Sequence, residues 1–222
     1  MIRPDARGQG ASVAPPASWT LDDFTNDLAS IMDQLHLPRA HLAGFSMGGL
    51  IAQAFALRFP KRVGKLAILA ATTGRSANEQ TKLLQRLEFI RRHHPIEYFD
   101  TVAAPRWFTD AFRAARPDVV DYCRRVVAGN NHSNYISAYE VLVANDLIDQ
   151  IGNIRHETLV LTAENDLGAG PAVARRISDA IKGSKLIIFP RLKHHILLEA
   201  PDAVGSILRE FFPRRSVGNI VT

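Results

Sequence analysis

The segment GFSMGG, Gly44–Gly49, separates a short apolar run from a longer stretch of helical character. The pattern Gly-x-Ser-x-Gly at a strand-to-helix turn is typical of a nucleophilic serine raised above the carboxyl ends of the strands. We expect the turn to need small residues at Gly44 and Gly48 because a side chain there would collide with a neighbouring strand or helix. The same turn aims the backbone N–H of Met47 at a developing oxyanion. A purely structural glycine-rich corner is the alternative, so Ser46 needs a base and an acid downstream.

Strand-like and helix-like segments alternate on both sides of this turn. The spacing of apolar residues predicts helices at Thr20–Leu35, Met47–Phe59, Ala172–Ile181 and Pro201–Phe212. Short apolar runs predict strands at Ala40–Gly44, Gly64–Ala71, Thr158–Thr162 and Lys185–Phe189. Because strands that alternate with helices form a mostly parallel sheet with helices on both faces, the sequence predicts an α/β fold.

The middle of the chain interrupts this alternation. It has no clear strand and combines helical stretches with many aromatic side chains. We therefore expect an α/β core at residues 1–75 and 150–213, a helical insertion at residues 76–149 over one end of the sheet, and a flexible tail at residues 214–222.

Composition restricts the function classes. The 222 residues, 46% apolar and 22% charged, fit one globular domain with a full core. A single cysteine, Cys123, excludes an internal disulfide and fits a reducing compartment. Without a secretion signal or an apolar run of membrane-spanning length, we expect a cytoplasmic protein that does not bind membranes. The net charge of +5 comes from dispersed basic residues, which predict solvated helix faces and no nucleic-acid partner.

An acidic residue and a histidine follow the next predicted strands of the core. Asp166 comes just after the third strand, with Glu164 as a competitor, and His194 and His195 follow the fourth. Each alone fits a turn or loop residue. Ser, Asp and His in this order, each directly after a strand, form the chain order of a catalytic triad on an open α/β sheet. In such a triad imidazole takes the serine proton, and a carboxylate orients the imidazole.

The chain resembles the α/β-hydrolase superfamily, in its esterase-like branch, from Met1 to about Phe212. The likeness rests on the segments DARGQGAS (residues 5–12), GFSMGG (44–49), AEND (163–166) and HHILLEAP (194–201). In that family the catalytic histidine usually precedes a glutamate by five positions. His194 and Glu199 fit this register, so the resemblance assigns the base to His194, although Lys193 stands where the family often has glycine.

The resemblance also interprets the helical insertion as the family's cap, which covers the active site and sets substrate choice. The stretch RWFTDAF (residues 106–112) and the stretch containing Asn131, Tyr135 and Tyr139 look like caps of 3-oxoadipate enol-lactonases. This likeness implies that Trp107 and Phe108 line the pocket, with packing in the cap core as the alternative. It also implies that Arg106 or Arg124 holds a substrate carboxylate.

The resemblance implies a serine hydrolase of small carboxylic esters or enol-lactones that works through an acyl-enzyme. Ser46 is then the nucleophile, His194 the base, Asp166 the orienting acid and Met47 an oxyanion donor, with no metal or organic cofactor. A carbon–carbon bond hydrolase with the same triad is one alternative. A non-catalytic ligand-binding protein that keeps the fold is another.

The family normally has about fifty or more residues before the segment at residues 5–12. They include a strand beside Ala40–Gly44 and a loop that usually supplies a second oxyanion N–H. The resemblance matches residues 1–3 to the end of the preceding strand. Three interpretations remain: the chain is a fragment of a longer one, the first strand shifts to close the sheet, or the protein is a degenerate member. We favour the first and expect a longer reading frame upstream.

Overall fold

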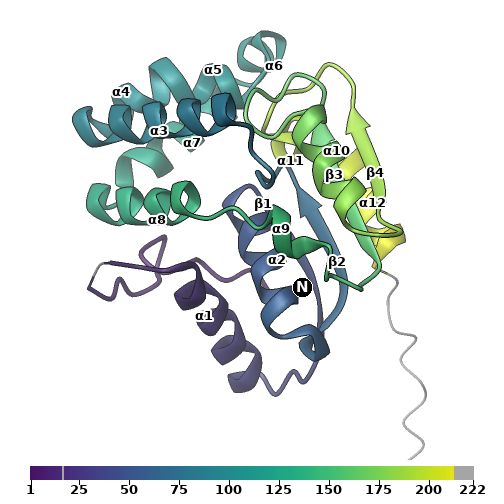
Figure 1. The fold of residues 1–222 in the computed structure, drawn as a ribbon. Coiled ribbons are helices and arrows are strands. Elements are labelled where there is room, and N and C mark those ends of the chain that lie inside the picture. Colours follow the sequence, from purple (N-terminus) through teal and green to yellow (C-terminus); the bar gives the residue numbers. More distant parts are fainter. Residues whose placement is uncertain (17, 213–222) are drawn as a thin grey trace, which may run out of the picture.

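A computed structural model gives the fold of residues 1–16 and 18–212 (Figure 1). The tail expected at residues 214–222 lies outside this described part. One four-stranded sheet has the order β1-β2-β3-β4, and every neighbouring pair is parallel. The predicted parallel sheet is therefore confirmed, with strands β1 (Ala40–Phe45), β2 (Val63–Leu69), β3 (Thr158–Ala163) and β4 (Lys185–Phe189).

Helices cover both faces of this sheet because successive strand residues point to opposite sides. Leu66 and Ile68 of β2 belong to a core shared with helices on one face, whereas Ala67 and Leu69 join the core on the other face. The first face carries α1 (Leu21–Gln34), α2 (Met47–Arg58), α9 (Ile148–Ile151) and α10 (Pro171–Ala180). The second face carries α12 (Pro201–Phe211), which follows the short α11 (Ile196–Glu199).

Local chemistry sets the helix and strand ends close to the predicted positions. Thr20 and Asp23 form a capping box in which each side chain accepts from the other residue's backbone N–H, so α1 begins at residue 21. Pro60 opens the 3₁₀ turn η1 (Pro60–Arg62) directly after α2. The second strand ends two residues before the predicted Ala71, because Ala70 leaves the extended conformation with φ 44°.

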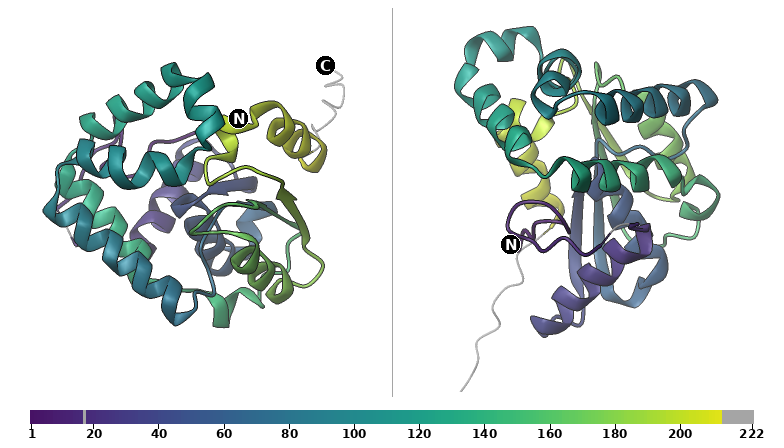
Figure 2. Two further views of the ribbon diagram at one scale, coloured as in Figure 1. Left: turned by 90° about the horizontal axis from the view of Figure 1, so that it is seen from above. Right: turned by 90° about the vertical axis from the view of Figure 1, so that its left-hand side faces the viewer.

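Residues 76–149 form helices and no strand, as the sequence predicts. They comprise α3 (Ala77–Arg92), α4 (Pro95–Tyr98), the π-helical η2 (Phe99–Ala103), α5 (Ala104–Trp107), α6 (Asp110–Ala115), α7 (Pro117–Gly129) and α8 (His132–Ala144). We call this group the cap. It has an apolar core of its own, in which Tyr98, Phe99 and Phe108 are fully buried. Figures 1 and 2 show the cap beyond the carboxyl ends of the strands, where it covers that edge of the sheet.

The two connections between cap and core are bonded to each other. The Asp146 carboxylate accepts hydrogen bonds from the backbone N–H groups of Gly74 (2.7 Å) and Arg75 (2.8 Å). The buried Arg75 side chain in turn donates to the carbonyls of Val143 and Asn145 at the end of α8, the latter at 2.6 Å. Residues that enter and leave the cap are thus held together at one place, which fixes how the cap meets the sheet.

The N-terminal segment forms a loop against α1. Arg7 makes a bidentate ion pair with Asp27 at 2.7 and 2.8 Å. Residues 1–3 belong to no strand, and β1 pairs with β2 alone among the described residues. The residues matched to a strand end therefore form no strand here, and the interpretation that a shifted first strand closes the sheet is wrong. Within residues 1–16 and 18–212, no helix combines the length and hydropathy that crossing a membrane requires.

The junction between β1 and α2 is crowded at two glycines, only one of them predicted. A Cβ on Gly44 would lie 2.1 Å from the Gly48 carbonyl oxygen, which confirms the expectation for Gly44. A Cβ on Gly48 would meet nothing within 4 Å, so the expectation for Gly48 was wrong. The second crowded position is Gly49, whose Cβ would lie 2.5 Å from Cβ of Ala71.

These distances predict opposite effects of two alanine substitutions. Gly44→Ala forces the backbones of β1 and α2 apart and should lower the free energy of unfolding by roughly 2–4 kcal/mol. Gly48→Ala enters open space in a helix, where alanine is favoured by up to about 1 kcal/mol, and should be neutral or stabilising. Urea unfolding of both variants beside the parent measures this difference. Equal destabilisation by the two substitutions would contradict it.

Candidate active site

Ser46 occupies the turn between β1 and α2 in a strained backbone conformation. Its φ of 53° and ψ of −118° are rarely adopted by residues other than glycine. Backbone hydrogen bonds hold this conformation. The Ser46 N–H donates to the Leu69 carbonyl (2.8 Å), and the Ser46 carbonyl accepts from Gly49 N–H (2.9 Å). The hydroxyl is thereby presented at the carboxyl end of β1.

The three residues predicted for the triad meet in one chain of hydrogen bonds. His194 Nε2 lies 3.2 Å from Ser46 Oγ, and His194 Nδ1 lies 2.7 Å from Asp166 Oδ2. The other Asp166 oxygen accepts from the backbone N–H groups of Gly168 (2.8 Å) and Ala169 (3.0 Å). Both the Asp166 and the His194 side chains are buried. This is the geometry in which imidazole accepts the serine proton while a carboxylate fixes the imidazole.

The two competing residues lie elsewhere. Exposed Glu164 accepts a hydrogen bond from the Arg191 backbone N–H at 2.8 Å and does not contact the imidazole of His194. The His195 ring lies among aromatic side chains and makes no hydrogen bond to Ser46. The structure thus distinguishes Asp166 from Glu164 and His194 from His195, although the members of each pair lie close together in the sequence.

The charge of Asp166 is stabilised within the protein. Burial raises the pKa of this carboxyl, but the His194 imidazolium and hydrogen bonds from His194, Ala169 and Gly168 outweigh burial and lower the pKa to about 2. The group is therefore a carboxylate across the neutral range. As an acceptor it keeps a proton on His194 Nδ1, which leaves Nε2 to face Ser46 as the base.

Met47 begins α2, so its backbone N–H has no partner within the helix. It donates to no other group in the described part of the chain. The positive end of the helix dipole adds to the attraction for negative charge at this position. These features suit the oxyanion role that the sequence suggests for Met47.

The residues expected to contact substrate differ in their surroundings. Phe108 is fully buried in the cap core and stacked on Phe112 with ring centroids 5.3 Å apart, which favours the packing alternative. Trp107 is half-buried, and its ring lies edge-on to His195. Arg124 is already paired with Asp100 at 2.8 Å, so its expected role in holding a substrate carboxylate is not supported. Half-buried Arg106 has no such partner in the described residues.

Glu199 connects the loop that carries His194 to the cap. One carboxylate oxygen accepts from both the backbone N–H and the hydroxyl of Thr109, each at 2.7 Å. The other oxygen accepts from the backbone N–H of Lys193, the residue before His194, at 2.9 Å. From the sequence, Glu199 only indicates that His194 and not His195 fits the family spacing. Its contacts with a segment 90 residues away depend on the folded cap.

Two further bonds join the same segments. Lys193 Nζ donates to the Pro105 carbonyl at 2.8 Å, and His195 N–H donates to the Trp107 carbonyl at 2.9 Å. The departure from glycine at Lys193 therefore adds a contact with the cap. We call the bonds between residues 105–109 and residues 193–199 the cap latch.

His195 lies against three aromatic rings. Its ring centroid is 5.0 Å from that of Phe45, 5.7 Å from that of Trp107 and 5.4 Å from that of Phe108, the last nearly parallel. Burial, with a smaller contribution from the charge of His194, lowers the pKa of His195 to about 4. The ring is therefore neutral at pH 7 and packs as an aromatic side chain.

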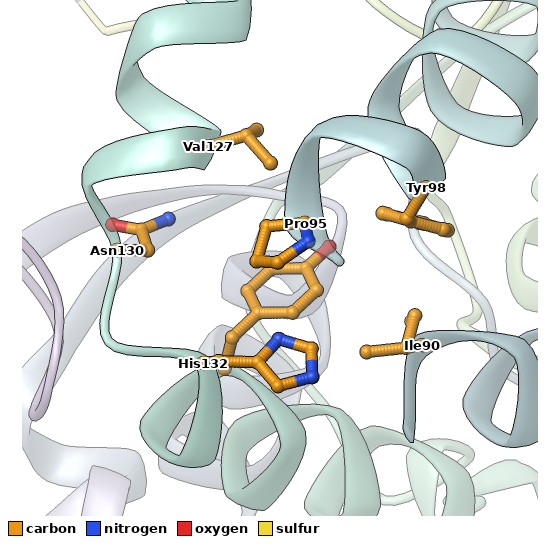
Figure 3. Close-up of a pocket in the computed structure, with 7 residues that line it drawn as sticks. Ile90, Pro95, Tyr98, Val127, Asn130 and His132 are labelled. Carbon is orange, nitrogen blue, oxygen red and sulfur yellow. The ribbon is translucent and has the colours of Figure 1, made fainter. Parts of the chain in front are cut away.

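A crevice inside the cap is separate from this site (Figure 3). Its walls come from α3, α4, α7 and α8 and include Ile90, Tyr98 and His132. It leaves no room for a water molecule and contains no member of the triad, so it belongs to the packing of the cap. Within the described residues, no group of His, Cys, Asp and Glu is arranged to hold a metal ion.

Replacing Glu199 tests whether the cap latch positions the base. Glu199→Gln places an amide N–H₂ against the Lys193 N–H, two donors facing each other, and should let the His194 loop shift. We expect Ser46 to react with a fluorophosphonate about tenfold more slowly. Arg176→Met is the control, because it removes an ion pair between α10 and Glu79 of the cap that is not part of the latch. An unchanged labelling rate with a raised KM would mean that Glu199 supports only the cap.

The lowered pKa of His195 predicts a pH-dependent loss of stability. Between pH 6.5 and 4 the unfolded chain protonates this histidine while the folded chain does not, so its contribution is complete above pH 6.5 and decreases as the pH falls. The loss amounts to about 2 kcal/mol at pH 5. The free energy of unfolding of His195→Phe, measured with urea, should therefore rise relative to that of the parent by about 2 kcal/mol between pH 7.5 and pH 5. A constant difference between the two proteins would contradict the shift.

Comparisons with known proteins agree with this architecture. The family described as alpha/beta hydrolase fold matches residues 1–201. The chain is 28% identical to 3-oxoadipate enol-lactonase 2 of Acinetobacter baylyi, covering 93% of this chain and 78% of that protein. It is 29% identical to 2-hydroxy-6-oxononadienedioate/2-hydroxy-6-oxononatrienedioate hydrolase of Escherichia coli, covering 95% and 75%.

Solved structures give the same result in three dimensions. The enol-lactonase from Burkholderia xenovorans superposes with a TM-score of 0.86 at 30% identity, over 93% of this chain and 78% of that one. A thermophilic esterase from Thermogutta terrifontis superposes with a TM-score of 0.83 at 25% identity, over 93% and 77%. Since the family pattern extends over most of the chain and the solved relatives share its fold, the chain belongs to the alpha/beta hydrolase fold family as an enzyme homologous to enol-lactonases and esterases.

Proposed function

We propose that this enzyme is a serine hydrolase that cleaves small carboxylic esters or enol-lactones through an acyl-enzyme. The observation that carries the proposal is the continuous hydrogen-bond chain from Ser46 through His194 to Asp166. The names of an enol-lactonase and an esterase among the similar proteins support the substrate class. No step of this chemistry requires a metal or an organic cofactor.

The proposed reaction begins when Ser46 Oγ attacks the carbonyl carbon and His194 Nε2 takes the hydroxyl proton. Asp166 stabilises the imidazolium that results, and the Met47 N–H donates to the oxyanion. As the carbonyl re-forms, the bond to the leaving oxygen breaks and His194 returns the proton to that oxygen. A water molecule deprotonated by His194 then attacks the acyl-enzyme, and His194 returns that proton to Ser46 Oγ as the acid leaves.

We assign substrate choice to the cap at residues 76–149, with the core at residues 1–75 and 150–213 supplying the triad. Trp107 is a candidate wall of the pocket because it is half-buried and its backbone carbonyl bonds to the residue next to the base. Arg106 is a candidate polar contact because its Nε is buried without a partner. Phe108 contributes by packing beneath this segment.

Hydrolysis of a carbon–carbon bond is the second candidate. The relative from Escherichia coli is named as a hydrolase of an oxo-dienedioate, a substrate class in which a carbon–carbon bond is cleaved. The same triad can serve that reaction, in which the bond that breaks joins the attacked carbonyl carbon to another carbon instead of to oxygen. Parallel assays with an enol-lactone and with a vinylogous 1,5-diketone acid separate the two candidates by their relative kcat/KM.

Labelling and two carboxylate variants test the proposed triad. A fluorophosphonate probe should modify Ser46 in the parent and leave Ser46→Ala unlabelled. Asp166→Asn should lower kcat on p-nitrophenyl acetate by roughly three to four orders of magnitude, because the wrong imidazole tautomer then faces Ser46. Glu164→Gln is the matched control and should retain the parental rate. Equal losses in the two carboxylate variants, or label on another residue, would contradict the assignment.

A further inference from the structure

Aromatic rings connect the imidazole of His194 to the cap. The ring centroid of Phe45, the last residue of β1, lies 5.1 Å from that of His194 and 5.0 Å from that of His195. His195 in turn stacks on Phe108 of the cap at 5.4 Å with the two planes 15° apart, and Phe108 stacks on Phe112 at 5.3 Å. We call Phe45, His195, Phe108 and Phe112 the aromatic row. It extends from the proposed base across the boundary between core and cap.

The hydrogen bonds of His194 leave its ring one freedom of movement. Its Nδ1 faces Asp166 and its Nε2 faces Ser46, and the hydrogen bonds of imidazole nitrogens lie in the plane of the ring. A ring held at these two atoms can still tilt about the line that joins them, which turns the lone pair of Nε2 away from Ser46. Because the distance of 3.2 Å between Nε2 and Ser46 Oγ is at the long end of the hydrogen-bond range, a small tilt weakens this contact strongly.

Phe45 opposes this tilt because its ring lies against the imidazole of His194, and aromatic rings at such separations attract each other. The position of Phe45 is itself fixed from two sides. Its backbone pairs with that of Leu69 in β2, and its ring contacts His195. Ser46 follows directly in the chain, so the proposed nucleophile and the ring that restrains the base belong to one turn.

The His195 ring is held by the cap. Its backbone N–H donates to the Trp107 carbonyl at 2.9 Å, the Trp107 ring lies edge-on to the imidazole, and Phe108 stacks on it. Its Nδ1 is buried and has no hydrogen-bond partner among residues 1–16 and 18–212, so this side of the ring contributes packing alone. Near pH 7 the ring is neutral, because burial lowers the pKa of His195 to about 4. The position of the cap therefore determines where this ring lies, and the ring supports Phe45.

We propose that Phe45 and His195 are positioning residues, which hold the imidazole of His194 in line with Ser46 when the cap lies on the core. Phe45 restrains the tilt of the base, and His195 couples the position of the cap to that of Phe45. Both act through the imidazole of His194 and are distinct from the triad. The proposal rests on the proposed function, since it concerns the alignment of the same nucleophile and base.

Substitutions of His195 in the full chain test this role through the reactivity of Ser46. His195→Ala removes the ring and should lower both the rate of fluorophosphonate labelling and kcat on p-nitrophenyl acetate by about tenfold, with KM changed by less than about twofold. His195→Phe supplies a ring again and should recover most of the loss. His93→Ala is the matched control, because it removes a histidine that stacks on Phe89 in the cap, with ring centroids 3.8 Å apart. A parental rate in His195→Ala, or no recovery in His195→Phe, would overturn the proposal.

A double variant tests whether His195 acts through Phe45. Phe45→Leu alone should also slow the labelling by about tenfold. The variant Phe45→Leu/His195→Ala should then be no slower than the slower single variant, whereas independent contributions would multiply to a loss of about a hundredfold. Rates are taken per reactive site, from the final extent of labelling, and urea midpoints show that each variant is folded. A hundredfold loss would overturn the coupling between the two residues.

Proton NMR separates this proposal from the proposed function, because it requires no reaction. The proton that His194 Nδ1 shares with Asp166 should give a low-field resonance, identified by its absence from Asp166→Asn. We expect this resonance to shift or broaden in His195→Ala and to be retained in His195→Phe. If it does so while the parent is not labelled, the serine mechanism is wrong and the positioning role stands. If Ser46 is labelled while His195→Ala matches the parent in rate and resonance, the positioning role is wrong and the serine mechanism stands.

Discussion

The hydrogen bond between His194 Nδ1 and Asp166 Oδ2 is the interaction on which the rest of the site depends. It joins the loops after β3 and β4, which are neighbours only because the sheet is parallel and its carboxyl ends share one edge. It also balances the burial of a charge, since the carboxylate and the imidazole are withdrawn from water together. Without it, neither the tautomer of His194 nor the direction of its Nε2 toward Ser46 would be fixed.

The triad was predictable because its positions follow from strand order, and strand order follows from the pattern of apolar runs. The choice of His194 over His195 depended on a family resemblance, and the structure gives the reason: His195 packs among aromatic rings of the core and the cap. The expectation that Gly48 is crowded was wrong because a sequence motif shows where small residues occur but not whether a neighbouring atom would collide with a side chain there. The backbone carbonyl of Gly48 crowds Gly44, but the space into which a Cβ on Gly48 would point is open.

Contacts within the cap were beyond the sequence for a physical reason. The spacing of apolar residues predicts that helices form but not how short helices pack. In the sequence Arg86 and Arg124 cannot be told apart, because each is an arginine on a predicted helical stretch. Only the folded cap separates Arg124 of α7, which pairs with Asp100 of η2, from Arg86 of α3, which approaches the loop after β3. The cap latch has the same origin, since Glu199 and Thr109 approach each other only when the cap lies over the sheet. The proposed catalytic groups thus lie at strand ends, which the sequence pattern locates, whereas the contacts of the cap depend on packing between helices.

The backbone conformation of Ser46 lowers the stability of the fold at the position of the proposed nucleophile. Its φ of 53° with ψ of −118° costs a residue with a side chain about 1–3 kcal/mol relative to an unstrained conformation. Glycine would avoid that cost. The fold therefore stores free energy as backbone strain at the residue whose hydroxyl faces His194 Nε2, so the position that shapes the proposed site is also one of local instability.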